Sequence, residues 1–294
     1  MKIIRALGKV LAIVILLILL VLGLATLLEY RPQEVTELAP VEGDRVFNQK
    51  EFSVLIYNIG YGGLGDDADF FMDGGSSVHP QSKEVVEKNL EGIAQELKDH
   101  PVDFYLFQEV DLSSKRSYGL NQQAFIEKSL GLKGSFGTNY KAFYVPYPLP
   151  TIGKVHSGLL SLSSYRSDRV YRKSLPVPFS WPTRTMNLKR CLLVEEFPIE
   201  GSEQKLILIN LHLEAYDSGE GKKLQSETLL HLAQSYYAQG HYVLAGGDWN
   251  QLFPGSEEPV PERGDQWIPG KLMKEDLPDG WGYIADLGTP SCRS

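Results

Sequence analysis

The chain has 294 residues, of which 43% are hydrophobic, enough to bury one large core or two smaller ones. Its formal net charge of −8 disfavours non-specific binding to nucleic acid, because that binding needs clustered Lys and Arg. Two distant cysteines, Cys191 and Cys292, make neither a disulfide framework nor a zinc site, and we interpret them as buried or incidental thiols. The sequence also lacks the nucleophile elbow of serine hydrolases, the phosphate-binding loop of nucleotide hydrolases and the His-Glu-x-x-His zinc helix.

The N-terminal segment is an apolar run over residues 10–28, close to the length that a helix needs to cross a bilayer. Lys2, Arg5 and Lys9 precede it and Glu29 follows, so the rest of the chain is expected outside the membrane. The alternative is a cleaved signal peptide, but the end of the run does not read as a small-x-small cleavage site. We therefore expect a single-pass anchor in the cell membrane.

Composition divides the chain into three parts. Residues 1–29 are interpreted as a cytoplasmic stub and transmembrane anchor, and residues 30–50, with prolines and several acids, as a linker. Residues 51–294 form the main domain.

The main domain begins with a β-rich run over residues 51–58, which a glycine-rich turn follows. A helix is predicted next, because Ser82 can cap it, apolar residues recur at helical spacing and Pro101 closes it. An apolar strand follows over residues 103–109. Further strands are predicted over 159–162, 190–197, 206–213 and 242–248, and further helices over 122–130 and 224–237. This pattern indicates an α/β layered domain.

Polar residues lie at or just past the ends of several predicted strands. They are Asn58, Glu109, His212, Asp248 and Asn250. Each alone is compatible with a structural role, but strand ends in layered α/β folds are where sites are built. Two carboxylates with amide oxygens suit a hard cation such as Mg²⁺, and a histidine beside them suits proton transfer or a hydrogen bond to developing charge. Together they favour phosphoester hydrolysis.

Four short motifs occur in order along the chain: Tyr-Asn-Ile at 57–59, Gln-Glu-Val at 108–110, Asn-Leu-His-Leu at 210–213 and Gly-Asp-Trp-Asn at 247–250. They resemble successive motifs of the endonuclease/exonuclease/phosphatase superfamily, which includes pancreatic-type deoxyribonucleases and bacterial sphingomyelinases. The resemblance covers roughly residues 50–290. It implies a four-layered α/β sandwich, with two β-sheets face to face and helices outside.

The resemblance also implies roles for matching residues. Glu109 would be the main metal ligand with Asn58 at or near the metal, which we expect to be Mg²⁺, with Mn²⁺ or Ca²⁺ as alternatives. His212 would hydrogen-bond the phosphate or protonate the leaving oxygen. Asp248 and Asn250 would orient the attacking water and the phosphate.

Arg190, at the start of a predicted strand, looks like the arginine that the superfamily places near the phosphate. Arg184 and Lys189 are close in sequence and are alternatives for this role, and a surface cation is the other interpretation of Arg190.

The C-terminal part departs from the superfamily pattern, which ends with a strand and a Ser-Asp-His triplet. The last histidine here is His241, and Asp286 lies in a stretch that resembles the loop before those strands. We therefore expect the final strands and one catalytic dyad to be missing, and the chain to be a fragment of a longer protein.

The resulting hypothesis is a membrane-anchored, extracellular, metal-dependent phosphoester hydrolase, either a phosphodiesterase such as a nuclease or a phosphatase, that uses in-line attack by water. The alternative is a non-catalytic relative that binds a phosphate ligand at the cell surface. Candidate substrates are a lipid headgroup, a polyol phosphate or nucleic acid, and no protein partner is predicted. The aromatic and proline-rich loop at 176–182 is interpreted either as a lipid or substrate contact or as packing.

Overall fold

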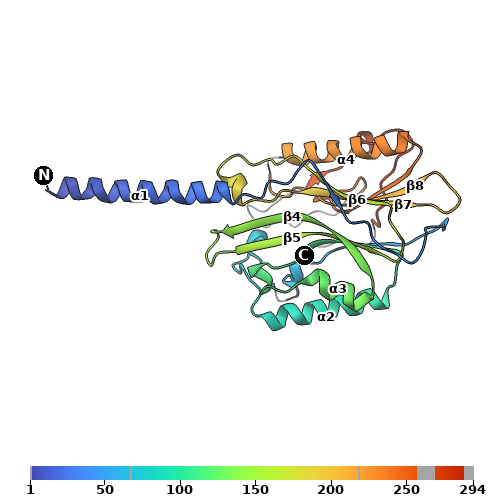
Figure 1. Cartoon of the computed structure of the whole chain (residues 1–294), viewed down its shortest axis with the longest axis horizontal. Helices are drawn as coiled ribbons and strands as arrows, with labels where there is room; N and C mark the ends of the chain where they lie inside the picture. Colours follow the sequence, from blue (N-terminus) through green and yellow to red (C-terminus); the bar gives the residue numbers. More distant parts are fainter. Residues whose placement is uncertain (1, 67, 218, 257–268, 288–294) are drawn as a thin grey trace.

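A computed structural model describes residues 2–66, 68–217, 219–256 and 269–287. Two β-sheets lie face to face, helices cover their outer faces, and one long helix projects from the domain (Figure 1). The layered α/β sandwich preceded by an apolar helix, expected from the sequence, is thereby confirmed.

The first sheet has four strands in the order β2–β3–β5–β4. β2 and β3 are parallel, and the other neighbours are antiparallel. Helices α2 and α3 pack on the outer face of this sheet. The bounds are β2 Val54–Asn58, α2 Lys83–Asp99, β3 Phe104–Asp111, α3 Gln122–Leu130, β4 Lys133–Val145 and β5 Gly153–Ser163.

The second sheet has five strands in the order β1–β6–β7–β8–β9, with β8 and β9 parallel. Helix α4 covers its outer face (Figure 1). The bounds are β1 Val35–Leu38, β6 Arg169–Ser174, β7 Cys191–Pro198, β8 Lys205–His212, α4 Glu220–Ala238 and β9 Tyr242–Asp248. A short parallel pair, β10 Gln251–Leu252 and β11 Gly270–Lys271, follows.

Helix α2 shows how local sequence builds the outer layer. The Ser82 hydroxyl accepts a hydrogen bond from the Val85 amide at 3.4 Å and caps the first turn. The buried stripe on α2 then packs against Tyr105 and Phe107 of β3. The capped amphipathic helix and the strand it covers are therefore placed as the sequence predicted.

The space between the sheets changes character along the strands. At one end it is filled by Phe104 and Leu106 of β3 with Leu206 and Leu208 of β8. Further along, Gln108 donates to Asn210 Oδ1 at 2.8 Å, linking the two sheets. The inner faces therefore become polar toward the carboxyl ends of β3 and β8.

The segment assigned by composition to a linker forms part of the fold. β1 pairs antiparallel with β6, and Val41 and Phe47 are buried. Because these contacts are backbone pairing and isolated side chains rather than a periodic apolar pattern, composition alone did not indicate them. The segment between the N-terminal helix and the main domain is thus paired with the second sheet.

The N-terminal helix, α1 Lys2–Leu27, carries a candidate membrane span over Ile3–Leu27, and none of its most apolar window is buried. A helix of 26 residues is about 39 Å long, which exceeds the hydrocarbon thickness of a bilayer.

Candidate active site

Glu109 lies near the end of β3, at a bulge. The pairing of β3 with β5 shifts register between Phe107 and Val110, so Gln108 and Glu109 fall in the irregularity. Glu109 has φ of +56°, a left-handed conformation that costs free energy in a residue with a side chain. Its carboxylate remains 21% exposed, whereas Gln108 is fully buried. The bulge thus turns one carboxylate out of the core, as bulges beside sites commonly do.

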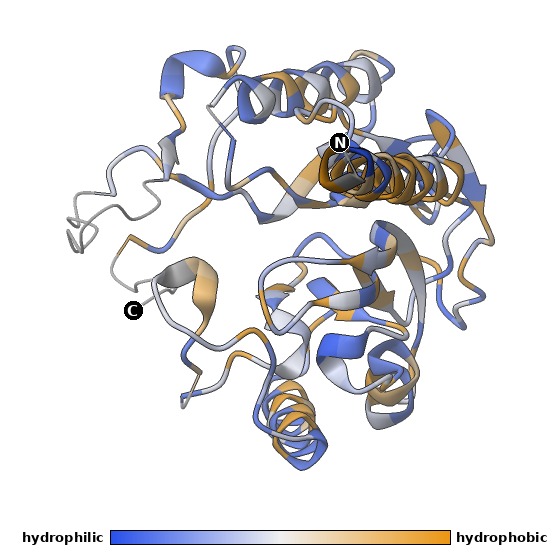
Figure 2. Cartoon of the chain, turned by 90° about the vertical axis from the view of Figure 1, so that its left-hand side faces the viewer, coloured by the Kyte–Doolittle hydropathy of each residue, from blue (hydrophilic) through white to orange (hydrophobic). Residues whose placement is uncertain are grey.

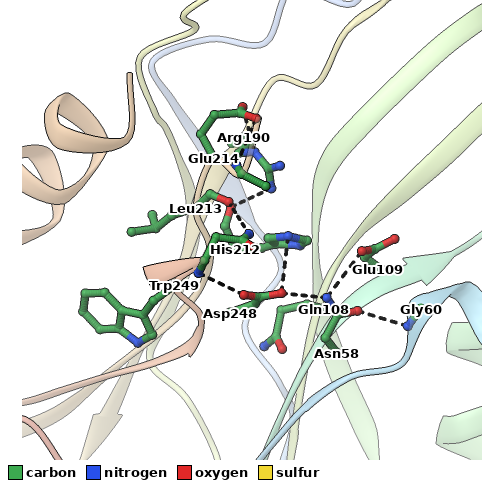
Figure 3. A network of polar contacts seen from close by, with 12 residues as sticks. Asn58, Gly60, Gln108, Glu109, Arg190, His212, Leu213, Glu214, Asp248 and Trp249 are labelled. Atoms are coloured by element: carbon green, nitrogen blue, oxygen red, sulfur yellow. Dashed lines mark hydrogen bonds and ion pairs between the residues drawn. The ribbon is translucent and has the colours of Figure 1, made fainter. Parts of the chain in front are cut away.

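Asn58 joins this carboxylate to a second one from the other sheet. Its Nδ2 lies 3.3 Å from Glu109 Oε1 and 2.8 Å from Asp248 Oδ2. Its Oδ1 accepts a hydrogen bond from the Gly60 amide at 3.0 Å, which fixes the amide plane (Figure 3). Three of the residues that the sequence singled out therefore meet where β2, β3 and β9 end.

Two glycines allow β9 to approach its neighbours this closely. A Cβ on Gly246 would lie 2.8 Å from Cδ1 of Ile56 in β2, and one on Gly247 would lie 2.0 Å from the Leu211 carbonyl oxygen. Gly247 also has φ of +148°. The Gly-Gly pair before Asp248 is therefore needed to bring this carboxylate to Asn58.

His212 ends β8 beside Asp248. Its Nε2 lies 3.6 Å from Asp248 Oδ2, and its side chain is buried. Burial lowers the pKa of His212, and the charge of Arg190 lowers it further, against the opposing effect of Asp248 and Glu109. The imidazole is therefore neutral near pH 7 and beside a carboxylate.

Arg190 contacts the backbone of His212 and the side chain of Glu214. Its Nε donates to Glu214 Oε2 at 3.0 Å, and its Nη1 donates to the His212 carbonyl oxygen at 3.1 Å (Figure 3). Burial raises the pKa of Glu214, but the charge and hydrogen bond of Arg190 lower it more, so the net shift is downward. Arg190 and Glu214 thus form a buried ion pair that holds the end of β8.

The other two cations considered for this role lie elsewhere. Arg184 and Lys189 contact Glu29 at 3.1 and 3.3 Å, beside the end of α1. The structure therefore places them at the exit of the N-terminal helix rather than beside Glu109.

Asn250 positions Asp248. Its Nδ2 donates to the Leu213 carbonyl oxygen at 2.8 Å, and its backbone amide donates to Asp248 Oδ1 at 3.0 Å. It has φ of +51°, a second non-glycine residue in the left-handed region near the site. Asn250 therefore fixes the turn after β9 and the direction of the Asp248 carboxylate.

Arg116 belongs to this site although the sequence did not single it out. It contacts Glu109 Oε2 at 3.5 Å, donates to both oxygens of Asp111 at 3.0 and 3.2 Å, and lies 3.8 Å above the Tyr61 ring. Burial lowers its pKa, but Asp111 and Glu109 raise it more. Nothing in the local pattern distinguishes Arg116 from Lys115; only the buried carboxylate of Asp111 at the end of an apolar strand signals a need for a cation.

The groups that this site offers to a cation are two carboxylates, Glu109 and Asp248. Among the described residues, no group of three or more His, Cys, Asp and Glu side chains could hold a metal. Glu109 and Asp248 nevertheless face one amide group from opposite sides. Mg²⁺ commonly binds through one or two carboxylates and keeps several waters, so this sparse donor set suits it better than a metal that needs a complete protein cage.

A separate cavity of about 340 Å³ lies between the loop after β6 and the start of α4. Its lining includes Pro178, Phe179, Tyr216 and Asp217, and none of the carboxylates near Asn58. The cavity is therefore separate from the candidate site.

No protein-family model matches the chain, and no curated protein matches it. Solved structures that resemble it include a truncated TDP2 from Caenorhabditis elegans, with 21% identity and a TM-score of 0.44 over 74% of this chain and 68% of that one. ANGEL2, a 2′,3′-cyclic phosphatase, has 20% identity and a TM-score of 0.45 over 76% and 58%. This chain spans only half of the length of another C. elegans TDP2 structure.

An endonuclease/exonuclease/phosphatase from Beutenbergia cavernae has 19% identity and a TM-score of 0.42 over 60% of this chain and 43% of that one.

Proposed function

We propose that this protein is a metal-dependent phosphoester hydrolase that α1 anchors in the cell membrane, with the main domain outside. The observation that carries this proposal is the convergence of Glu109 and Asp248, from different sheets, on the Asn58 amide beside His212. Two carboxylates and a histidine at one point match the needs of phosphoester hydrolysis, in which positioning and charge neutralisation supply most of the catalysis.

The proposed roles follow from the contacts. Glu109 would hold a divalent cation, for which we propose Mg²⁺, with Asn58 beside it to orient the carboxylate through Nδ2, and that cation would neutralise charge on the phosphate. Asp248, whose direction Asn250 fixes, would orient the attacking water and accept its proton. The water oxygen then bonds to phosphorus, the bond to the leaving oxygen breaks, and the leaving oxygen takes a proton from solvent.

His212 and the two arginines would act around this step. The neutral imidazole of His212 would hydrogen-bond a phosphoryl oxygen as negative charge develops. Arg190 would fix the backbone of His212 through the hydrogen bond to its carbonyl oxygen, and Arg116 would fix the Glu109 carboxylate through their ion pair. The substrate would be a phosphoester near the membrane, such as a lipid headgroup, a polyol phosphate or extracellular nucleic acid.

The test is hydrolysis of bis-p-nitrophenyl phosphate and p-nitrophenyl phosphate by the full chain in detergent, with and without Mg²⁺ or Mn²⁺. Glu109→Gln keeps the side-chain shape and is expected to lower metal-dependent turnover roughly 100-fold or more. Glu203→Gln, which removes an exposed carboxylate in the β7–β8 turn, is the matched control. Retained turnover in Glu109→Gln would overturn the site assignment, and phosphate binding without any turnover would favour the binding module.

A further inference from the structure

We propose that the turn between β4 and β5 is a second membrane contact, seated in the headgroup layer of the bilayer that α1 crosses. This inference rests on the anchoring proposed above. The hairpin tip is defined here as residues 143–149, the last residues of β4 and the first part of the turn, and the bilayer surface it fits is one that contains anionic lipid.

The hairpin tip exposes large side chains that a soluble surface seldom gathers on one turn. Phe143 is 66% exposed, Tyr147 75% and Leu149 80%, and Tyr144 is also exposed. Contiguous exposed apolar groups of this kind mark interaction sites. Tyrosines among them suit the interface, where an aromatic ring meets apolar chains and its hydroxyl meets water.

The hairpin tip lies at the end of the domain from which α1 projects (Figure 1). Lys141 of β4 approaches the Tyr30 ring at 5.8 Å, just past the end of α1, which places the hairpin beside the helix exit. Figure 2 views this end of the domain along α1. A bilayer crossed by α1 would therefore meet the hairpin tip first among the loops of the first sheet.

Direct contacts hold the end of α1 against the domain. Trp181 Nε1 donates to Thr26 Oγ1 in the last turn of α1 at 3.0 Å, and Trp181 is otherwise half exposed. Arg184 and Lys189 both bind Glu29. The helix is thus docked rather than loosely tethered, and Trp181 stands where interfacial tryptophans are enriched.

Charge along this hairpin is opposite to that of the whole chain. The chain carries −8, yet residues 128–167 contain no Asp or Glu. Lys141 and Lys154 flank the hairpin tip. Basic residues beside apolar ones are the combination that binds anionic headgroups.

The candidate site lies at the same end of the sandwich. β3 runs toward the hairpin tip, since Asp111 pairs with Ser157, close to the start of β5 at Gly153. Glu109 therefore lies at the hairpin end of its strand. With the hairpin tip on the bilayer, the site would face the headgroup layer, which favours a substrate that resides there.

The test uses the full chain in vesicles of phosphatidylcholine and phosphatidylglycerol, with an environment-sensitive fluorophore at Leu149→Cys. Cys292 is replaced by Ser, while Cys191 stays because its thiol is buried and burial raises its pKa to about 11. The label is expected to shift its emission to the blue and to lose fluorescence to headgroup-spin-labelled lipid. Lys141→Glu with Lys154→Glu is expected to weaken both effects in anionic vesicles.

Two further labels separate the possible failures. A label at Glu203→Cys, exposed in the β7–β8 turn, is the negative control, and a label at Ile15→Cys in α1 reports insertion of the helix. A Leu149 label as solvent-exposed as the Glu203 label, with the Ile15 label quenched by acyl-chain spin labels, would overturn the hairpin contact and leave the anchor standing. An unquenched Ile15 label would overturn the anchor itself, whereas hydrolysis of soluble phosphoesters in detergent depends on neither.

Discussion

The Asn58 amide nitrogen lies 2.8 Å from a carboxylate oxygen of Asp248, and this contact joins β2 of one sheet to β9 of the other. The same nitrogen lies 3.3 Å from Glu109 Oε1, so one amide N–H₂ group lies between two carboxylates. The Asn58 N–H groups thus reduce the repulsion between the Glu109 and Asp248 carboxylates.

Asn58→Asp tests whether this point attracts a cation. A third carboxylate beside Glu109 and Asp248 should lower stability without metal by roughly 1–3 kcal/mol through like-charge repulsion. Mg²⁺ should then raise the Tm of the variant more than that of the wild type, because binding to the folded state alone stabilises it. Thermal unfolding with EDTA and with Mg²⁺ measures both effects.

The control for that substitution is Asn48→Asp. Asn48 also donates to a carboxylate, Glu200, at 3.0 Å, but on the exposed surface. Its replacement should leave the response to Mg²⁺ unchanged. Equal responses of the two variants would count against a cation at Asn58.

Arg116→Met tests the arginine that contacts both Glu109 and Asp111. The substitution leaves the Asp111 carboxylate, which is fully buried, without its bidentate partner, and it frees Glu109. Loss of one partner of a buried pair costs about 3–5 kcal/mol, so the midpoint of urea unfolding should fall sharply. Arg116→Lys should lose less, because the charge remains while the planar fork is lost.

Arg166→Met is the matched surface substitution. Arg166 contacts Asp168 at 3.7 Å with both side chains well exposed, so its loss should cost no more than about 1 kcal/mol. A similar cost for both variants would mean that Arg116 has no special structural role.

Much of the fold and site follows from sequence because their signals are local. The helix α3 has the bounds that the sequence predicted, and α2 begins after its Ser82 cap. The strand ends carrying Asn58, Glu109 and Asp248 converge because the carboxyl ends of the parallel pairs β2–β3 and β8–β9 lie at one end of the sandwich.

The rest depends on partners far along the chain. β4 contains two glycines and several polar residues, so its apolar alternation is weak, and its position is fixed by pairing with β5. Arg190 could be placed at a strand start, but the direction of its guanidinium depends on Glu214, which no local pattern links to it. Both cysteines were interpreted as buried or incidental thiols. Cys191 is buried and free, and Cys292 lies outside the described residues.

Gly247→Ala tests the close approach of β9 to β8. A methyl group would lie 2.0 Å from the Leu211 carbonyl oxygen, and the φ of +148° is one that alanine rarely adopts. The backbone must move, so we expect a loss of roughly 3 kcal/mol or more and displacement of Asp248. Gly92→Ala in α2, where a Cβ meets nothing within 4 Å, should instead stabilise by about 0.5–1 kcal/mol. Chemical denaturation of both variants measures the contrast, and a neutral Gly247→Ala would contradict the close approach.

Glu195→Gln tests a buried carboxyl away from the site. Glu195 lies on β7 between the sheets and is 3% exposed, and burial raises its pKa to about 7 against the opposing effect of the Ser135 and Ser161 hydroxyls. Between about pH 4.5, the ordinary value, and pH 7, the folded protein keeps a proton that the unfolded chain releases. Stability therefore falls by on the order of 3 kcal/mol as pH rises through this window. Above the window, this group no longer changes it.

The glutamine variant keeps the shape and stays neutral, so it should match the wild type near pH 4 and become more stable than it above pH 7. Other groups titrate in both proteins and cancel in the difference between their free energies of unfolding, measured in urea at a series of pH values. Glu203→Gln, at an exposed position, should show no such trend. An advantage of Glu195→Gln that is independent of pH would mean that Glu195 is ionised in the fold, and that the interior between the sheets is more polar than its packing indicates.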